Sequence, residues 1–185
     1  MIPELLKETE AKMKKSIEAT RHEFTLIRTG RASPAILEHV KVDMYGTTLP
    51  LNQVAAITVP EPRQLLITPF DRNALPHIEK GILKSDVNLN PNNDGAAIRL
   101  NIPPLNEERR KELIKQVHQK AEMGRVAIRN NRHEAIKHLQ AAKKASEISE
   151  NEEKRAADQV QKLVDKYIAE IDQLTKAKEA ELLEV

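Results

Sequence analysis

The sequence predicts an α+β protein in which a long antiparallel three-helix bundle carries a small inserted β/α/β domain. Two observations predict this fold class. Three long stretches with helical spacing of apolar residues lie toward the two ends of the 185-residue chain, and nine of the ten prolines fall between Arg31 and Pro104. We therefore assign the bundle to residues 1–30 and 105–185, and the inserted β-rich α+β domain to residues 31–104.

The first helical stretch runs from Pro3 to Arg28, and Pro3 is tolerated in a first turn. Glycine suits the left-handed conformation that ends many helices, so we expect this helix to stop at Thr29 and Gly30, with Pro34 discouraging its continuation. Its apolar residues recur at heptad-like spacing: Leu6, Met13, Ile17, Phe24 and Ile27.

The inserted segment contains four short β-rich runs, each bounded by Gly, Pro or Asn: residues 39–46, 55–60, 63–70 and 97–103. One short helix is predicted from Leu75 to Lys84, and residues 90–95 form a turn-rich loop. A domain of about 70 residues is large enough to fold alone.

The second long helix is predicted over about 38 residues between Asn106 and Ala145, roughly 55 to 60 Å at 1.5 Å per residue. Asn106 is the expected N-cap, and Glu107 and Glu108 follow in the first turn, where the helix dipole favours negative charge. One apolar seam is expected: Leu113, Ile114, Val117, Ala121, Ile128, Ala135, Leu139 and Ala142.

The third helix follows Ser149, which forms a capping-box pattern with Glu152 and precedes an apolar seam that continues to near the C-terminus. From Ser146 onward, eleven acidic residues outnumber six basic ones. None of the three amphipathic helices can bury its seam alone, so they are expected to pack together as an antiparallel bundle.

Basic residues concentrate on the second helix, with eleven Lys or Arg against three acidic residues between Arg109 and Lys144. Arg125, Arg129 and Arg132 follow at i, i+4 and i+7, which places three guanidinium groups in a narrow arc beside the seam. Like-charged neighbours on a helix reduce its stability by a few tenths of a kcal/mol each unless an anion binds to them. We infer an anionic partner, since arginine suits phosphate, although a solvated basic face is the alternative.

Catalytic and metal-binding motifs are absent. The sequence has no phosphate-binding glycine loop and no nucleophile elbow, and without cysteine it has neither disulfides nor thiolate ligands. His133 and His138 are five residues apart, about 140° around a helix, so they cannot share a metal. We expect no enzyme, cofactor, catalytic residue or metal site. No apolar run could span a bilayer and the charged N-terminus is no secretory signal, so a cytoplasmic location is expected.

Six ordered motifs, spread over essentially the whole chain, make it resemble the bacterial ribosome recycling factor family. They are Ile27-Arg28-Thr29-Gly30-Arg31-Ala32-Ser33-Pro34, Tyr45-Gly46-Thr47, Leu89-Asn90-Pro91-Asn92, Pro103-Pro104-Leu105 followed by Glu107-Glu108-Arg109-Arg110-Lys111, Arg125-Val126-Ala127-Ile128-Arg129-Asn130, and Glu147-Ile148-Ser149-Glu150.

The resemblance implies an L-shaped, tRNA-like outline and a monomer that binds the post-termination ribosome. With elongation factor G and GTP, such a protein promotes subunit separation and release from mRNA, and it hydrolyses nothing itself. The resemblance further implies docking of the bundle on large-subunit ribosomal RNA. The residues expected to bind that RNA, with Arg125 added from the arc, are Arg132, Arg129, Arg125, Arg110, Arg28 and Arg31.

Two linkers, residues 29–34 and 102–106, are expected to join the two domains. Such a double linker permits bending, with a rigidly docked pair as the alternative. The expected hinge residues are Thr29, Gly30, Arg31, Pro103, Pro104 and Leu105.

The competing functional interpretation is a non-enzymatic coiled-coil or chaperone-like protein whose basic face binds an acidic partner. It explains the helices and their charge, but leaves the inserted domain and the ordered motifs unexplained.

Overall fold

The computed structural model describes residues 1–184, and the chain divides into two compact units. Unit 1 contains Met1–Arg28 and the chain from Asn106 onward, whereas unit 2 is Thr29–Leu105. The divisions predicted from the sequence, at 30/31 and 104/105, lie two residues and one residue away from these. Unit 1 consists of three helices: α1 (Ile2–Thr25), α4 (Glu107–Lys144) and α5 (Glu150–Leu183).

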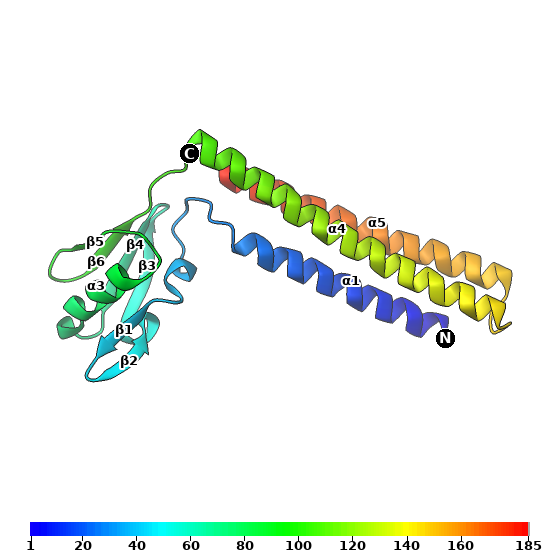
Figure 1. Cartoon of the computed structure of the whole chain (residues 1–185), viewed down its shortest axis with the longest axis horizontal. Helices are drawn as coiled ribbons and strands as arrows, with labels where there is room; N and C mark the ends of the chain where they lie inside the picture. The colour runs from blue at the N-terminus through cyan, green and yellow to red at the C-terminus, as the bar shows by residue number, and fades with distance from the viewer. Residues whose placement is uncertain (185) are drawn as a thin grey trace. The chain divides into compact units, whose positions relative to one another are not determined.

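In unit 1, α4 runs antiparallel to both α1 and α5, and each helix contacts the other two (Figure 1). The predicted packing of long helices is confirmed. Within the expected α4 seam, only Ile114 is half-buried rather than buried, and Gly124 joins the buried set. No helix in residues 1–184 combines the length and apolar character needed to cross a membrane. Fully buried apolar side chains come from all three helices: Met13, Val117, Ile128, Leu139, Val160 and Ile171.

Local capping chemistry sets the start of both long C-terminal helices. Asn106 Oδ1 accepts a hydrogen bond from the backbone N–H of Arg109 at 2.7 Å. The Ser149 hydroxyl accepts from the Glu152 N–H at 3.1 Å, and the Glu152 carboxylate accepts from the Ser149 N–H at 3.3 Å. These side chains satisfy backbone donors that have no partner within the helix, so α4 and α5 begin where the sequence indicated.

The end of α1 differs from its prediction. The helix ends at Thr25, three residues before Arg28. The Thr25 hydroxyl donates to the His22 carbonyl at 2.6 Å, and Leu26 keeps a right-handed backbone conformation as the C-cap. Gly30 does adopt the left-handed region, at φ +79°, but lies well beyond the helix. It therefore turns the linker and does not cap α1.

The three helices of unit 1 approach one another closely at Gly124. A Cβ atom at this position would collide with the Thr20 hydroxyl of α1 and lie 3.0 Å from Cδ1 of Ile171 on α5. A glycine in the middle of a helix costs about 1 kcal/mol relative to alanine. Here its absent side chain makes room for both neighbouring helices.

Unit 2 combines short helices with antiparallel strands. Its four-stranded sheet has the order β3-β4-β6-β5, and β1 and β2 form a separate pair. Along the chain, the elements are η1 (Pro34–Leu37), β1 (Lys41–Met44), β2 (Thr47–Pro50), α2 (Leu51–Val54), β3 (Ala55–Glu61), β4 (Gln64–Pro69), η2 (Arg72–Ala74), α3 (Leu75–Lys84), β5 (Pro91–Asn93) and β6 (Ile98–Asn101).

The core of unit 2 forms from alternate strand residues and one face of α3. Leu65 and Ile67 of β4 pair in register with Leu100 and Ile98 of β6, and all four are fully buried. This alternation places one face of the sheet in the core. α3 contributes Leu75, Ile78 and Ile82 to the same cluster, and β1 contributes Val42 and Met44.

Two strands, β2 and β5, were not predicted from the sequence. β5 occupies Pro91–Asn93, inside the segment expected to be a turn-rich loop. It pairs with β6 in an antiparallel register that sets Pro91 opposite Leu100. Three residues rich in turn formers become a strand here because a neighbouring strand supplies the hydrogen-bonding partner, which no local pattern reveals.

Candidate nucleic-acid interface

Arg132, about two thirds of the way along α4, is oriented by α5 without being neutralised. Its Nε donates a hydrogen bond to Oε1 of Gln161 at 2.8 Å, and Nε2 of Gln161 donates to Oδ1 of Asp165 at 3.0 Å. No carboxylate of residues 1–184 lies within 4 Å of the Arg132 guanidinium as an ion-pair partner. The positive charge is therefore held in position while its outer nitrogens remain available to an anion.

Arg125 makes much stronger contacts within the bundle. Its Nε and Nη2 both donate to Oδ1 of Asp172 on α5, at 3.1 and 2.7 Å, and Nη1 donates to Glu122 at 3.2 Å. Only 21% of the side chain is exposed. The hydrogen bond to Asp172 raises the pKa of Arg125 above its ordinary value. Arg125 therefore joins α4 to α5 and offers little of its charge to a partner.

Arg129 lies between these two cases. It is exposed, and its Nη1 donates to Oε1 of Glu122 at 3.1 Å. Hydrogen bonds from Arg125 and Arg129 lower the pKa of Glu122 below its ordinary value. Two of the three clustered arginines, Arg125 and Arg129, thus form ion pairs with carboxylates of the chain itself. Of the three, only Arg132 has no carboxylate partner in residues 1–184, so the inference of an external anion rests on Arg132.

The residues that position these arginines were missed in the sequence. Glu122 could have been found, because it precedes Arg125 by three residues on the same helix. Asp172 and Gln161 lie 47 and 29 residues beyond the arginines that they contact. No local spacing connects such distant positions, so only the packing of α5 on α4 reveals them.

The remaining predicted arginines lie elsewhere. Arg110 is in the first turn of α4, half-buried, and its buried Nε has no hydrogen-bond partner in the part of the chain that the structure describes. At 1.5 Å per residue it lies about 33 Å along the helix axis from Arg132. Arg28 and Arg31 are exposed, on either side of the division between the units. The structure thus does not gather all six predicted arginines into one cluster.

Both linkers are tied to the turn between β3 and β4. The Ala32 N–H donates to the Pro62 carbonyl at 2.7 Å, and the Ile102 N–H donates to the Arg63 carbonyl at 2.8 Å. A Cβ at Gly30 would lie 3.3 Å from Cγ of Leu105, so the two linkers touch each other there. The predicted hinge residues 29–31 precede Ala32 in the chain and 103–105 follow Ile102, so neither of these two hydrogen bonds is made by a hinge residue.

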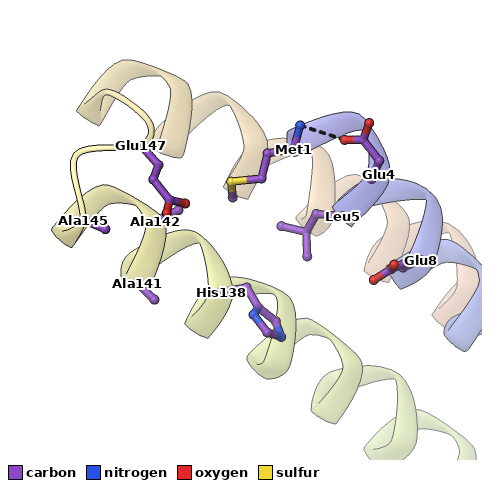
Figure 2. A pocket seen from close by; sticks show the side chains of 9 residues that line it. All are labelled: Met1, Glu4, Leu5, Glu8, His138, Ala141, Ala142, Ala145 and Glu147. Carbon is purple, nitrogen blue, oxygen red and sulfur yellow. Dashed lines mark ion pairs between the residues drawn. The ribbon is translucent and has the colours of Figure 1, made fainter.

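A hollow of about 670 Å³ lies at one end of unit 1, where the start of α1 faces the end of α4. Figure 2 shows the side chains that line it. Leu5 points into the space between the two helices, with Glu8 and His138 on facing sides. Glu4 pairs with the N-terminal amine at 2.7 Å, and Glu147 adds a third carboxylate. The charged side chains that line this hollow are carboxylates, so the hollow itself does not suit RNA phosphates.

Nowhere in residues 1–184 do three or more His, Asp or Glu side chains come together as a group that could hold a metal ion.

Comparison with known proteins assigns the chain to a family. Solved structures with this α+β architecture, a helical bundle carrying an inserted β-rich unit, include a translation factor studied in solution. That solution structure, of a ribosome recycling factor, matches with a TM-score of 0.75 and 44% identity, covering 100% of this chain and 98% of the other. A family model described as Ribosome recycling factor matches residues 20–183. The chain belongs to the ribosome recycling factor family, whose members are non-enzymatic translation factors.

Full-length relatives agree with this assignment. The ribosome-recycling factor of Carboxydothermus hydrogenoformans is 53% identical over 185 residues, covering 100% of both chains. That of Thermus thermophilus is 51% identical over 182 residues, covering 98% of each. A second structural match has a TM-score of 0.64, 50% identity and 100% coverage of both chains. It comes from models of the T. thermophilus ribosome recycling factor and E. coli elongation factor G bound to the E. coli post-termination complex.

Proposed function

We propose that this chain binds the post-termination ribosome through large-subunit ribosomal RNA. With elongation factor G and GTP, it then promotes separation of the subunits and release from mRNA. Its membership of the ribosome recycling factor family supports this proposal, as does the related structure described with elongation factor G on a post-termination complex. The protein would act as a monomer in the bacterial cytoplasm.

The observation that carries the docking proposal is the state of Arg132. Its guanidinium is oriented by Gln161 and lacks a carboxylate partner among residues 1–184. Structured RNA is recognised mainly through its shape and backbone, so a rigid helix that presents an oriented arginine suits a phosphate. Arg129 would support this contact, while Arg125 contributes by holding α4 on α5. Arg110, Arg28 and Arg31 would make separate contacts.

Unit 2 would act as a lever that elongation factor G moves during splitting. The two hydrogen bonds at Ala32 and Ile102 attach both linkers to unit 2. Bending would therefore concentrate at Thr29–Arg31 and Pro103–Leu105, where a few residues absorb the change in backbone angles.

The test is subunit splitting of post-termination ribosomes, followed by light scattering with elongation factor G and GTP present. The wild type is compared with Arg132→Ala and with Arg21→Ala. Arg21 is a matched control on α1 whose charge is already answered by Glu18 and Glu170. Splitting by the wild type and by Arg21→Ala, but not by a folded Arg132→Ala, supports the proposal. Normal splitting by Arg132→Ala rejects the docking site, and inactivity of the wild type with a matched translocase rejects recycling.

The coiled-coil interpretation explains less of the chain than the family assignment does. The family assignment accounts for the helices, the inserted unit and the ordered motifs together. A general basic coiled coil with an acidic partner accounts for the helices and their charge, but not for the inserted unit or the ordered motifs.

A further inference from the structure

Unit 2 contains a basic hollow of its own. It has a volume of about 360 Å³ and lies between β1, the β1–β2 turn and α3. The basic side chains that line it are Lys41, His77, Lys80 and Lys84, and Asp43 is its only carboxylate. We call these residues, together with Tyr45 at the turn, the lysine hollow.

The charge of unit 2 is distributed unevenly around this hollow. Between Thr29 and Leu105 the chain has seven Lys or Arg and seven Asp or Glu, so unit 2 carries no net charge. All three of its lysines nevertheless line the lysine hollow. None of them has an ion-pair partner within residues 1–184, and Asp43 is occupied by a hydrogen bond from the Thr48 hydroxyl at 2.7 Å.

The backbone beneath the lysine hollow brings two of the lysines together. α3 lies directly on β1, because a Cβ at Gly81 would come within 2.6 Å of the Lys41 carbonyl oxygen. This contact places Lys80, beside Gly81, next to the strand that carries Lys41. Lys80 and Lys84 are also neighbours at i, i+4 on α3, a like-charge pair that costs helix stability unless an anion answers it.

An exposed aromatic ring stands at the rim of the lysine hollow. Tyr45 is 75% exposed, although the whole chain has only two Tyr, two Phe and no Trp. It occupies the β1–β2 turn with a positive φ of 54°, and its hydroxyl donates to Oδ2 of Asp71 at 3.3 Å. The hydrogen bond fixes the direction of a ring that no packing buries.

We propose that the lysine hollow binds an unpaired segment of RNA. Lys41, Lys80 and Lys84 would take the phosphates, and the Tyr45 ring would stack against a base. Lysines beside a fixed, exposed aromatic ring are the combination by which proteins hold single strands with little sequence preference. This site is distinct from the docking of unit 1 and does not depend on it.

Tyrosine fluorescence gives the first test, because the chain has no tryptophan and Tyr167 is buried. In a Tyr167→Phe background, Tyr45 is the only tyrosine. Titration with hexauridylate at low salt should quench its emission along a saturable curve. The same titration should shift the backbone amide signals of Gly46 and Gly81 in NMR spectra, a readout that the arginines of unit 1 do not affect.

Variants of the full-length chain then assign the contacts. Lys80→Gln with Lys84→Gln should reduce the magnitude of the log–log salt slope by about 1.4, at about 0.7 per phosphate on single strands. Tyr45→Leu should weaken binding by about 5- to 150-fold, the range for loss of one stacked base. The matched control is Arg99→Gln, which removes a unit 2 charge that Asp94 already answers. Circular dichroism should show the same fold throughout.

Three results would overturn the proposal. The first is no quenching and no amide shift with hexauridylate. The second is that double-stranded RNA binds as tightly as hexauridylate, and that Tyr45→Leu does not weaken this binding. The third is binding of a hexaglutamate peptide, lost with the two lysines, when hexauridylate does not bind; it would identify an acidic protein surface as the partner.

Discussion

At the scale of single residues, neighbouring arginines of one helix do different work. Arg125 makes three hydrogen bonds to two carboxylates and is mostly covered, whereas Arg132 makes one hydrogen bond to a neutral amide. An arginine that is paired with a carboxylate inside the fold contributes to stability, whereas an arginine without such a partner is available to bind an anion. The exposure and partners of each guanidinium therefore predict which property its removal will change.

Removing Arg125 should destabilise the protein more than removing Arg132. Arg125→Ala should lower the free energy of unfolding by about 1 to 2 kcal/mol, because hydrogen bonds to charged groups are lost at a partly buried position. Arg132→Ala should lower it by about 0.5 kcal/mol, because only one hydrogen bond, to a neutral amide, is lost at this half-buried position. Urea denaturation followed by circular dichroism measures both values. Equal destabilisation by the two substitutions would show that Arg132 is structural.

Tyr167 offers a case in which removing a polar group should help. Its side chain is 2% exposed, and its hydroxyl has no hydrogen-bond partner in the described chain. Leaving a buried polar group unsatisfied costs about 1 to 3 kcal/mol, so Tyr167→Phe should be neutral or raise the free energy of unfolding. The control is Thr175→Val, because the Thr175 hydroxyl donates to the Ile171 carbonyl at 2.8 Å. That substitution should destabilise, and a marked loss in Tyr167→Phe instead would reveal a missing partner.

The same tyrosine should make stability depend on alkaline pH. Burial raises the pKa of Tyr167 above its ordinary value of 10.0. The unfolded chain therefore releases this proton first, and the contribution of Tyr167, fully present below about pH 10, is lost as pH rises through its folded pKa. The free energy of unfolding of the wild type should fall further below that of Tyr167→Phe as the pH rises from about 9 to 11. Taking the difference at each pH cancels the titration of lysines, and a constant difference would contradict the prediction.

At the scale of elements, Gly124 controls how closely the helices of unit 1 pack. Gly124→Ala gains about 1 kcal/mol in helix propensity, but overpacking a tight contact costs about 1 to 3 kcal/mol. The Thr20 hydroxyl cannot move away freely, because it donates to the Ser16 carbonyl at 3.0 Å. We expect a net loss of stability in thermal unfolding. Adding Thr20→Ala should recover part of it, and purely additive effects of the two substitutions would rule out the contact.

Elements were predictable from the sequence where local chemistry defines them. The starts of α4 and α5 follow from Asn106 and from the Ser149–Glu152 pair, which act within one turn of helix. β2 and β5 were missed because they are short and exist through pairing with β1 and β6. The early end of α1 at Thr25 is not predictable in this way, because Gly30, the residue in the sequence best suited to cap the helix, lies well beyond its end.

At the scale of the whole molecule, the distribution of prolines and helical seams indicated a bundle interrupted by a β-rich insertion. These features depend on composition over tens of residues, so they are visible in one sequence. The partners of the arginines are not, because Asp172 reaches Arg125 only after two helices have packed together. The family is recognisable from ordered motifs, whereas the division of labour among its arginines requires the structure.

Tying the two linkers together tests the proposed lever. Gly30 faces Leu105 across the linkers, and the chain has no native cysteine. Cysteines introduced at Thr29 and Leu105 can therefore be joined by a short bis-maleimide without competition from other thiols. Bending requires both linkers to change their backbone angles, so the crosslinked protein should bind ribosomes but split them at least about tenfold more slowly, a barrier increase of about 1.4 kcal/mol. The uncrosslinked double-cysteine variant controls for the substitutions themselves. Splitting at the uncrosslinked rate would show that unit 2 does its work without movement at these linkers.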